Sequence, residues 1–242
     1  MNKLIETIDL TKIYGEKETS VTALNSINTA FNENQFTAIM GPSGSGKSTL
    51  LHCLAGLDKV TGGSILINGV DLASLNDKEL TKMRRDSFGF VFQAFNLIPT
   101  LTAEENITLP SSIAGKKPEE EWVKQVIEAM DIGDRLGHRP NELSGGQQQR
   151  VAAARAMASK PEVIFADEPS GNLDSKSSKE LLVFMKSIVD DLNQTIVMVT
   201  HDTYAASFAE RVIMLKDGEI ANDLDTPTQE EIVSQVTSLT EI

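Results

Sequence analysis

The sequence predicts an α/β protein whose core is a mostly parallel β-sheet covered by helices on both faces. Three observations lead to this prediction. Apolar segments typical of buried strands alternate with segments in which apolar residues recur at helical spacing. A glycine-rich loop joins one of these strands directly to a helix. Polar side chains follow the strand ends, where open α/β sheets bind ligands.

The N-terminal third contains the strand and helix on either side of that loop. About the first 35 residues alternate in the manner of strands. Residues 36–40 predict a buried strand, 41–46 a Gly/Ser/Pro loop, and 47–57 a helix with leucines at helical spacing. A further strand over 65–67 ends in Asn-Gly, which is a strong hairpin signal.

The middle and C-terminal parts follow in the same alternating order. Residues 75–160 are rich in helix signals, and one helix is expected to begin near Pro118, with three glutamates in its first turn. Beyond residue 160 the pattern predicts, in order, a strand over 163–166, a helix over 176–190, a strand over 196–199, and strands over 212–215 and 219–220 joined by an Asp-Gly hairpin.

Composition excludes several classes of protein. The 242 residues suit one domain, and acids outnumber bases 35 to 22, which gives a net charge of −13. We therefore expect neither nucleic-acid binding nor electrostatic adhesion to an anionic membrane. No apolar run reaches the ~20 residues of a membrane span, and Glu6 interrupts what would be the apolar core of a secretory leader. The single cysteine, Cys53, excludes an intrachain disulfide and fits a reducing compartment.

Acidic residues are concentrated at the C-terminal end. Residues 217–242 contain seven acids and neither lysine nor arginine. One interpretation is a solvated tail that frays. The other is a short helix, because Thr228 and Glu231 form a capping-box pattern and apolar residues then recur at helical spacing. Its apolar positions would be Ile232, Val233, Val236 and Leu239.

The glycine-rich loop fits the pattern G-x-x-x-x-G-K-[ST] in full. Its residues are Gly41, Pro42, Ser43, Gly44, Ser45, Gly46, Lys47 and Ser48. Glycines let backbone N–H groups turn toward phosphate oxygens, and the following helix adds its positive N-terminal end. Lys47 would reach the β- and γ-phosphates, and Ser48 would bind Mg²⁺. The alternative is an ordinary glycine-rich turn with a surface lysine.

Two later strands also end in polar residues. The strand over 163–166 runs into Asp167 and Glu168, and the strand over 196–199 is followed by His201. Beside a phosphate loop, Asp167 suits the Mg²⁺ shell through water, and Glu168 is placed to polarise an attacking water. The alternatives are a solvated strand end and a structural histidine.

Residues 143–147, Leu-Ser-Gly-Gly-Gln, followed by Gln-Gln-Arg and an alanine-rich helix, resemble the signature of ABC-transporter ATPases. The resemblance covers nearly the whole chain. Gln93 matches the Q-loop, 170–174 the D-loop, His201 the switch histidine, and Tyr14 the aromatic residue that stacks on adenine. The signature also makes physical sense, because Ser144 can cap a helix whose glycine-rich first turn suits an anion.

The resemblance implies a P-loop NTPase fold of ABC type, with an N-terminal antiparallel β subdomain and an inserted helical subdomain. The whole chain, 1–242, would form one ATPase domain. Residues 1–92 and 161–225 would be its catalytic core, 93–160 its helical signature subdomain, and 226–242 its acidic tail.

The resemblance also implies a role for each matching residue, with ATP as the nucleotide. Lys47 and the amides from Ser43 to Thr49 would hold the phosphates. Ser48 and Gln93 would complete the Mg²⁺ shell, with Asp167 behind it. Glu168 would act as general base, and His201 would contact the γ-phosphate. In a head-to-tail dimer with two ATP, the signature residues would act on the nucleotide of the other copy, and Asp174 would support communication; these signature residues are Ser144, Gly145, Gly146 and Gln147.

Residues 88–99 resemble the same segment in ATPases of the macrolide-exporter (MacB), lipoprotein-releasing (LolD) and bacitracin-type peptide-exporter groups. Such ATPases work with an FtsX/MacB-like integral-membrane permease. An exposed apolar patch beside Gln93 would then receive the permease; its members are Phe95, Leu97, Ile98 and Pro99. The alternative is that these side chains are buried.

The sequence thus predicts the ATPase of a transporter that exports or extracts amphipathic substrates such as an antimicrobial peptide, a macrolide or a lipoprotein. It would sit on the cytoplasmic side of the membrane through its permease, without nucleic acid or inserted lipid contacts. A non-transporting complex that controls a cell-wall hydrolase or a sensor kinase is the alternative. A soluble repair or translation ATPase lacks support, because neither a long coiled coil nor a tandem domain is present, and an importer ATPase stays possible.

Overall fold

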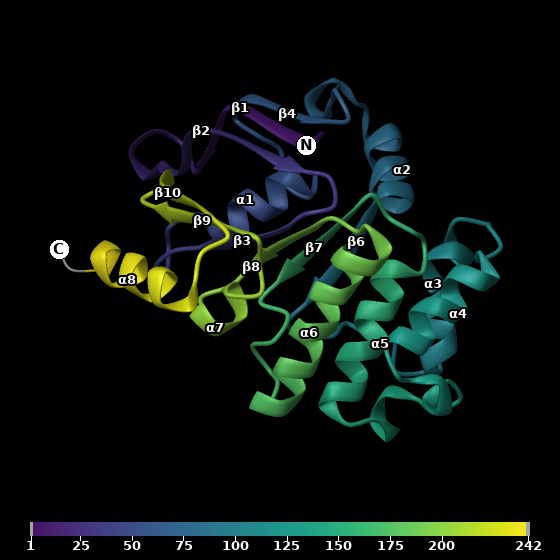
Figure 1. Cartoon of the computed structure of the whole chain (residues 1–242). Coiled ribbons are helices and arrows are strands. Elements are labelled where there is room, and N and C mark those ends of the chain that lie inside the picture. Colours follow the sequence, from purple (N-terminus) through teal and green to yellow (C-terminus); the bar gives the residue numbers. More distant parts are fainter. Residues whose placement is uncertain (1, 241–242) are drawn as a thin grey trace.

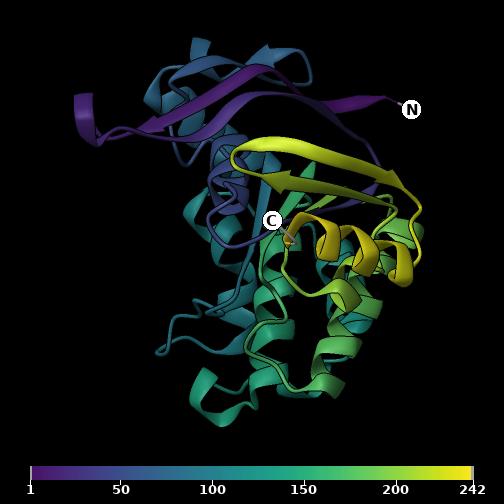
Figure 2. The same cartoon turned by 90° about the vertical axis from the view of Figure 1, so that its left-hand side faces the viewer.

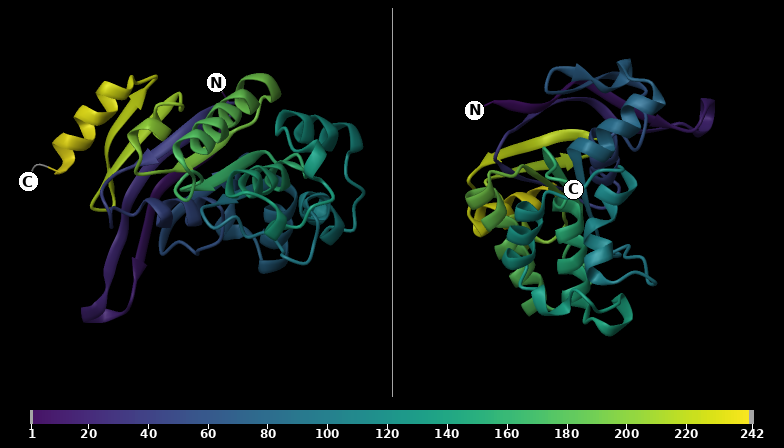
Figure 3. Two further views of the ribbon diagram at one scale, coloured as in Figure 1. Left: turned by 90° about the horizontal axis from the view of Figure 1, so that it is seen from below. Right: turned by 90° about the vertical axis from the view of Figure 1, so that its right-hand side faces the viewer.

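The computed structural model describes residues 2–240, apart from the side chains of Glu18 and Thr240, and builds them from two β-sheets and a set of helices (Figure 1). The first sheet is antiparallel, with the strand order β2-β1-β4-β5. Its strands are β1 (Lys3–Tyr14), β2 (Val21–Asn32), β4 (Gly62–Ile67) and β5 (Val70–Asp71). In Figure 3 the hairpin of β1 and β2 extends well beyond the rest of the molecule.

The second sheet has six strands in the order β10-β9-β3-β8-β7-β6. Each neighbouring pair from β9 to β6 is parallel, and only β10 joins antiparallel. This confirms the predicted mostly parallel core sheet. The strands are β3 (Phe36–Met40), β6 (Phe88–Phe92), β7 (Val163–Asp167), β8 (Ile196–Val199), β9 (Arg211–Lys216) and β10 (Glu219–Asp225).

Eight α-helices lie among the described residues, and three of them were not individually predicted. The helices are α1 (Lys47–Leu54), α2 (Asp77–Ser87), α3 (Ala103–Ile113), α4 (Glu120–Ala129), α5 (Gly145–Met157), α6 (Ser175–Leu192), α7 (Thr203–Ala206) and α8 (Gln229–Thr240). The helices α2 and α3 lie in the region 75–160 that was expected to be rich in helix but were not predicted individually, and α7 was missed. The helix predicted over 47–57 ends early, at Leu54, because Gly56 takes a left-handed conformation with φ of +61°.

Two hydrophobic cores lie on the two faces of the parallel sheet. The first core contains residues of the antiparallel sheet, of α1 and of the face of the parallel sheet that they cover. Leu10, Phe31 and Leu50 are fully buried in it. The other lies under the helices of the opposite face and includes Val126 from α4 and Leu182 from α6. Packing on both faces of the sheet fixes the positions of the loops that follow the parallel strands.

Both predicted hairpins are confirmed. Asn68 and Gly69 have φ of +49° and +78° between β4 and β5. Asp217 and Gly218 have φ of +49° and +79° between β9 and β10. Two successive residues with positive φ are the requirement of a type I′ turn, which matches the twist of the strands it joins.

The acidic C-terminal segment forms a helix, so the helical interpretation was correct. The Thr228 hydroxyl accepts a hydrogen bond from the Glu231 amide at 3.3 Å, and the Thr228 amide donates to the Glu231 carboxylate at 2.7 Å. This capping box begins α8, and Ile232 is fully buried against the sheet. The seventh acid counted above, Glu241, lies outside the described residues.

Candidate functional site

The polar residues predicted at strand ends lie along one edge of the parallel sheet. The phosphate loop follows β3, Gln93 follows β6, Glu168 follows β7 and Thr200 leads from β8 to His201. Because these four strands are parallel neighbours in the sheet, their carboxyl ends meet at the same edge. The sheet thus gathers residues that are far apart in the sequence.

The phosphate loop leaves the first amides of α1 available to a ligand. Gly46, at the start of α1, has φ of +98°, and no side chain among residues 2–240 caps this helix. The free N–H groups and the helix dipole make an anion site at this end. Gly41, at the other end of the loop, has φ of +146°, and a Cβ placed there would lie 2.1 Å from the carbonyl oxygen of Leu215 in β9.

Lys47 is folded back over this loop. Its Nζ donates to the carbonyl oxygens of Gly41 at 3.0 Å and Pro42 at 2.8 Å. Burial lowers the pKa of Lys47, while the carboxylates of Glu168 and Asp167 oppose that shift. A partly buried ammonium that is hydrogen-bonded to two neutral carbonyl oxygens is well suited to attract a phosphate group.

Ser48 and Asp167 form the oxygen-rich part of the site. Their side-chain oxygens lie 3.5 Å apart, and Nε2 of His52 lies 3.8 Å from the other carboxylate oxygen. Burial raises the pKa of Asp167, and the His52 side chain opposes the shift. A hydroxyl and a carboxylate suit Mg²⁺, which prefers oxygen ligands. Among residues 2–240, no cluster of three His, Cys, Asp or Glu residues that could hold a metal ion occurs.

Glu168 and His201 contact each other directly. Nδ1 of His201 lies 2.7 Å from one carboxylate oxygen, and the Thr200 hydroxyl donates to the other at 3.3 Å. Thr200 is fully buried and was not predicted, although its place between the apolar strand and His201 was a visible signal. Glu168 has φ of +47°, a conformation that side chains rarely adopt and that is typical of constrained functional positions.

Gln93 and Tyr14 both contact other residues of the chain. The Gln93 amide donates to Asn172 at 3.2 Å, and the Asn172 amide donates to the Gln93 backbone carbonyl at 3.0 Å, so Gln93 is held against the D-loop. Tyr14 is exposed, and Nζ of Lys12 lies 4.6 Å from its ring centre. The Tyr14 hydroxyl donates a hydrogen bond to the Asp58 carboxylate, and burial together with this carboxylate raises the pKa of Tyr14.

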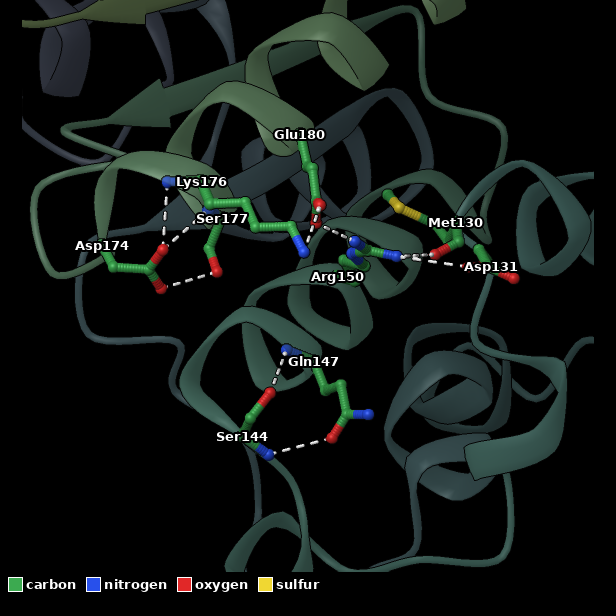
Figure 4. A network of polar contacts seen from close by, with 9 residues as sticks. All are labelled: Met130, Asp131, Ser144, Gln147, Arg150, Asp174, Lys176, Ser177 and Glu180. Atoms are coloured by element: carbon green, nitrogen blue, oxygen red, sulfur yellow. Dashed lines mark hydrogen bonds and ion pairs between the residues drawn. The ribbon is translucent and has the colours of Figure 1, made fainter.

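The signature residues and the D-loop begin two neighbouring helices (Figure 4). Ser144 caps α5: its hydroxyl accepts from the Gln147 amide at 3.3 Å, and the Gln147 side chain accepts from the Ser144 amide at 3.0 Å. Asp174 caps α6 by accepting from the Ser177 amide at 3.1 Å and hydroxyl at 2.8 Å. The hydroxyl hydrogen bond from Ser177 lowers the pKa of Asp174. A Cβ on Gly146 would lie 2.8 Å from the Ser177 hydroxyl, so the two first turns pack closely.

Arg150 joins the same two helices to the end of α4, as Figure 4 shows. Its guanidinium donates to the carboxylate of Glu180 in α6 and to the carbonyl oxygen of Met130 at 3.3 Å. Asp131 lies 3.7 Å away. Motif matching assigned no role to Arg150, because its partners come from α4 and α6, which lie on opposite sides of it in the sequence.

We expect Arg150→Met to lower the free energy of unfolding by about 2 kcal/mol, because two hydrogen bonds from a charged group are lost and Glu180 is left without its guanidinium. Urea unfolding followed by circular dichroism measures the change. Lys176→Met is the matched control, since Lys176 is 87% exposed and its Nζ lies 3.9 Å from Glu180. Equal destabilisation by both variants would contradict the assigned importance of Arg150.

The predicted apolar patch is only partly exposed. Ile98 is 39% exposed and Pro99 is exposed, whereas Phe95 and Leu97 are half-buried. Leu97 packs against the core beneath the helices. The patch therefore has a half-buried base, Phe95 and Leu97, and an exposed rim, Ile98 and Pro99.

A strand, a glycine-rich loop, an uncapped helix with Lys47 and Ser48, and an acidic strand end together define a P-loop NTPase. The comparisons with known proteins specify the family. The family model described as ABC transporter matches residues 24–171. The chain therefore belongs to the ABC-transporter ATPases, and it binds and hydrolyses ATP.

Individual relatives are similar over most of the chain. The chain is 46% identical over 226 residues to the uncharacterized ABC transporter ATP-binding protein MJ0796 of Methanocaldococcus jannaschii, covering 91% of this chain and 96% of that protein. It is 46% identical to the bacitracin export ATP-binding protein BceA of Halalkalibacterium halodurans, covering 91% and 88%. It is also 46% identical to the macrolide export ATP-binding/permease protein MacB of Marinobacter nauticus, covering 91% of this chain but only 34% of that longer protein.

A solved structure of MJ0796 supports the same fold. It is a dimer in a post-hydrolysis state bound to ADP and Pi, with a TM-score of 0.81 and 44% identity over 92% of this chain and 99% of that one. This agrees with the predicted ATP hydrolase activity. In residues 2–240 of the present chain, every helix is too short or too polar to cross a bilayer.

Proposed function

We propose that the chain is the ATP-hydrolysing subunit that powers an FtsX/MacB-like permease for the export or extraction of amphipathic substrates. The observation that supports this best is the arrangement of Lys47, Glu168 and His201 around one pocket, with the apolar rim of Ile98 and Pro99 on the segment that follows Gln93. The names of the relatives BceA and MacB, which include bacitracin export and macrolide export, agree with this class of substrate.

In the proposed reaction, Lys47 and the amides from Ser43 to Thr49 bind the phosphates. Glu168 accepts a proton from a water molecule while the oxygen of that water bonds to the γ-phosphorus. The bond between the γ-phosphorus and the oxygen that bridges it to the β-phosphate breaks, which gives ADP and phosphate. His201 orients the Glu168 carboxylate at 2.7 Å and contacts the γ-phosphate. Tyr14 stacks on the adenine.

Ser48 and Asp167 are the residues that would hold Mg²⁺, joined by Gln93 once it leaves Asn172. When bound, Mg²⁺ would neutralise phosphate charge. The side-chain oxygens of Ser48 and Asp167 lie 3.5 Å apart, which is close enough for both side chains to lie beside one such ion.

A head-to-tail dimer completes the proposed site. Ser144, Gly145, Gly146 and Gln147 of one copy would contact the nucleotide of the other copy, since α5 presents its N-terminus there and anions favour helix N-termini. Asp174 would transmit the contact, because it caps the helix that packs against Gly146. The dimeric structure of the relative MJ0796 supports self-dimerisation.

The proposed organisation follows from these roles. Residues 1–92 and 161–225 act as the catalytic core, 93–160 as the subdomain that carries the signature and the permease contact, and 226–242 as an appended tail. The chain would work on the cytoplasmic side of the membrane, attached through the permease. Purification of the native complex and identification of its membrane partner tests this; a partner unrelated to FtsX/MacB-like permeases would contradict the proposal.

Ile98→Glu is expected to leave the basal ATPase rate unchanged and to abolish its stimulation by the permease, because a charge would be placed in an apolar contact. The measurement is ATP turnover of the chain alone and of the reconstituted complex. Ile113→Glu is the matched control, since Ile113 is 72% exposed at the end of α3. Normal stimulation of the Ile98 variant would remove this rim from the interface.

A further inference from the structure

One pocket on the catalytic side of the phosphate loop has a wall that no motif includes. The pocket measures about 410 Å³. Part of its lining belongs to the site described above: Gly41, Pro42, Ser43, Lys47, Glu168 and His201, with Met40 at the end of β3. The remaining lining consists of Val236 and Leu239, which are successive apolar positions on α8.

Helix α8 is fixed where these two side chains reach the pocket. Figure 2 shows it alongside the hairpin of β9 and β10. Ile232 is fully buried, and Val236 and Leu239 pack against the same core. The Asn222 amide in β10 donates to the side-chain oxygen of Gln235 at 2.7 Å. A capped start, a buried face and a hydrogen bond to the sheet make α8 a stable part of the pocket.

The charge along α8 is distributed in a way that suits a phosphate pocket. The acids Glu230 and Glu231 stand in its first turn, whereas residues 232–240 contain no charged side chain. Leu239 follows Glu231 by eight residues, or about 12 Å along the helix axis. A triphosphate is strongly anionic, and a carboxylate close to it would repel it. Within the described residues, the part of α8 that lines the pocket therefore carries no charged side chain.

We propose that α8 is a wall of the nucleotide site, and that Val236 and Leu239 are binding-site residues on the phosphate side of the pocket. This rests on the proposed function, because it takes the triphosphate of ATP as the ligand. Apolar walls of low dielectric concentrate the field of the charged groups between them. The two side chains thereby strengthen the attraction between Lys47 and the phosphates.

The test is a reversal of charge sign at one position. Val236→Asp is expected to weaken binding of a non-hydrolysable ATP analogue with Mg²⁺ about tenfold, and Val236→Lys to strengthen it about threefold, measured by isothermal titration calorimetry on the full chain. Both effects should shrink at high salt, because salt screens the added charge. A helix with only a structural role would lose affinity equally with either substitution.

Val233 provides the matched control, because it lies on α8 but is 44% exposed and does not line the pocket. Val233→Asp and Val233→Lys should bind the analogue like the wild type. Leu239→Asp and Leu239→Lys repeat the test if a Val236 variant does not fold. If the Asp and Lys variants change the affinity for the analogue in the same direction, or not at all, at both Val236 and Leu239, the proposal that α8 is a wall of the nucleotide site is wrong. A wild-type chain that does not bind the analogue would instead overturn the proposed function.

Discussion

Glu168→Gln is expected to lower kcat for ATP hydrolysis by about 10³-fold while ATP binding is retained. The amide keeps the size of the side chain and its place beside His201 and Thr200, but it does not accept a proton from water at neutral pH. Loss of a positioned general base typically costs 10²–10⁴ in rate. A steady-state phosphate-release assay with saturating ATP and Mg²⁺ measures this change.

The same variant should accumulate as an ATP-bound dimer, because the nucleotide that joins the two copies persists. Multi-angle light scattering with saturating ATP and Mg²⁺ detects the dimer, and a purely monomeric chain would contradict the head-to-tail arrangement. Glu162→Gln is the matched control. This substitution makes the same carboxylate-to-amide change at a position just before β7, at the end of the strand remote from the site. The Glu162 carboxylate accepts a hydrogen bond from the Ser87 hydroxyl there. Its kcat should equal that of the wild type.

Gly41→Ala is expected to lower the free energy of unfolding by about 4 kcal/mol and to abolish nucleotide binding. The added Cβ would lie 2.1 Å from the Leu215 carbonyl oxygen and 2.7 Å from the Ser45 hydroxyl, so the strand or the loop must move. Overpacking of this kind costs about 1–3 kcal/mol, and an alanine held at positive φ adds about 1–3 kcal/mol. Urea unfolding and calorimetric titration with the ATP analogue measure the two effects.

Gly69→Ala separates the two causes of that destabilisation. Gly69 has φ of +78°, but a Cβ there would meet no atom within 4 Å. Backbone strain alone then costs about 1 kcal/mol, and nucleotide binding is unchanged. If the two alanine variants lose the same stability, the close approach between Gly41 and Leu215 has no energetic importance.

Local signals in the sequence predicted the elements that carry the chemistry. The hairpins at Asn68–Gly69 and Asp217–Gly218 and the cap at Thr228 depend on residues within four positions of each other, and all three are present. Three helices were not predicted individually: the α2 pattern is strongly polar, α3 contains Pro110, and α7 is only one turn long.

Contacts between distant segments could not be predicted in the same way. Gln93 bonds to Asn172, and Arg150 bonds to Glu180 and to the carbonyl of Met130. Each pairing depends on how β6, the D-loop and the helices pack, and a motif match supplies no such distance. The half-buried state of Leu97 likewise follows from core packing rather than from its apolar neighbours in the sequence.

The sequence by itself determined the fold class, the family and the residue types of the nucleotide site, because these depend on periodicity and on motifs of fixed spacing. Only the tertiary structure decided which distant residues share that site. It placed Val236 and Leu239, from a tail defined in the sequence by its acids, around the same pocket as Lys47 and His201. The physical reason is burial: Ile232 holds α8 against the parallel sheet, so Val236 and Leu239, rather than Glu230 and Glu231, line the phosphate pocket.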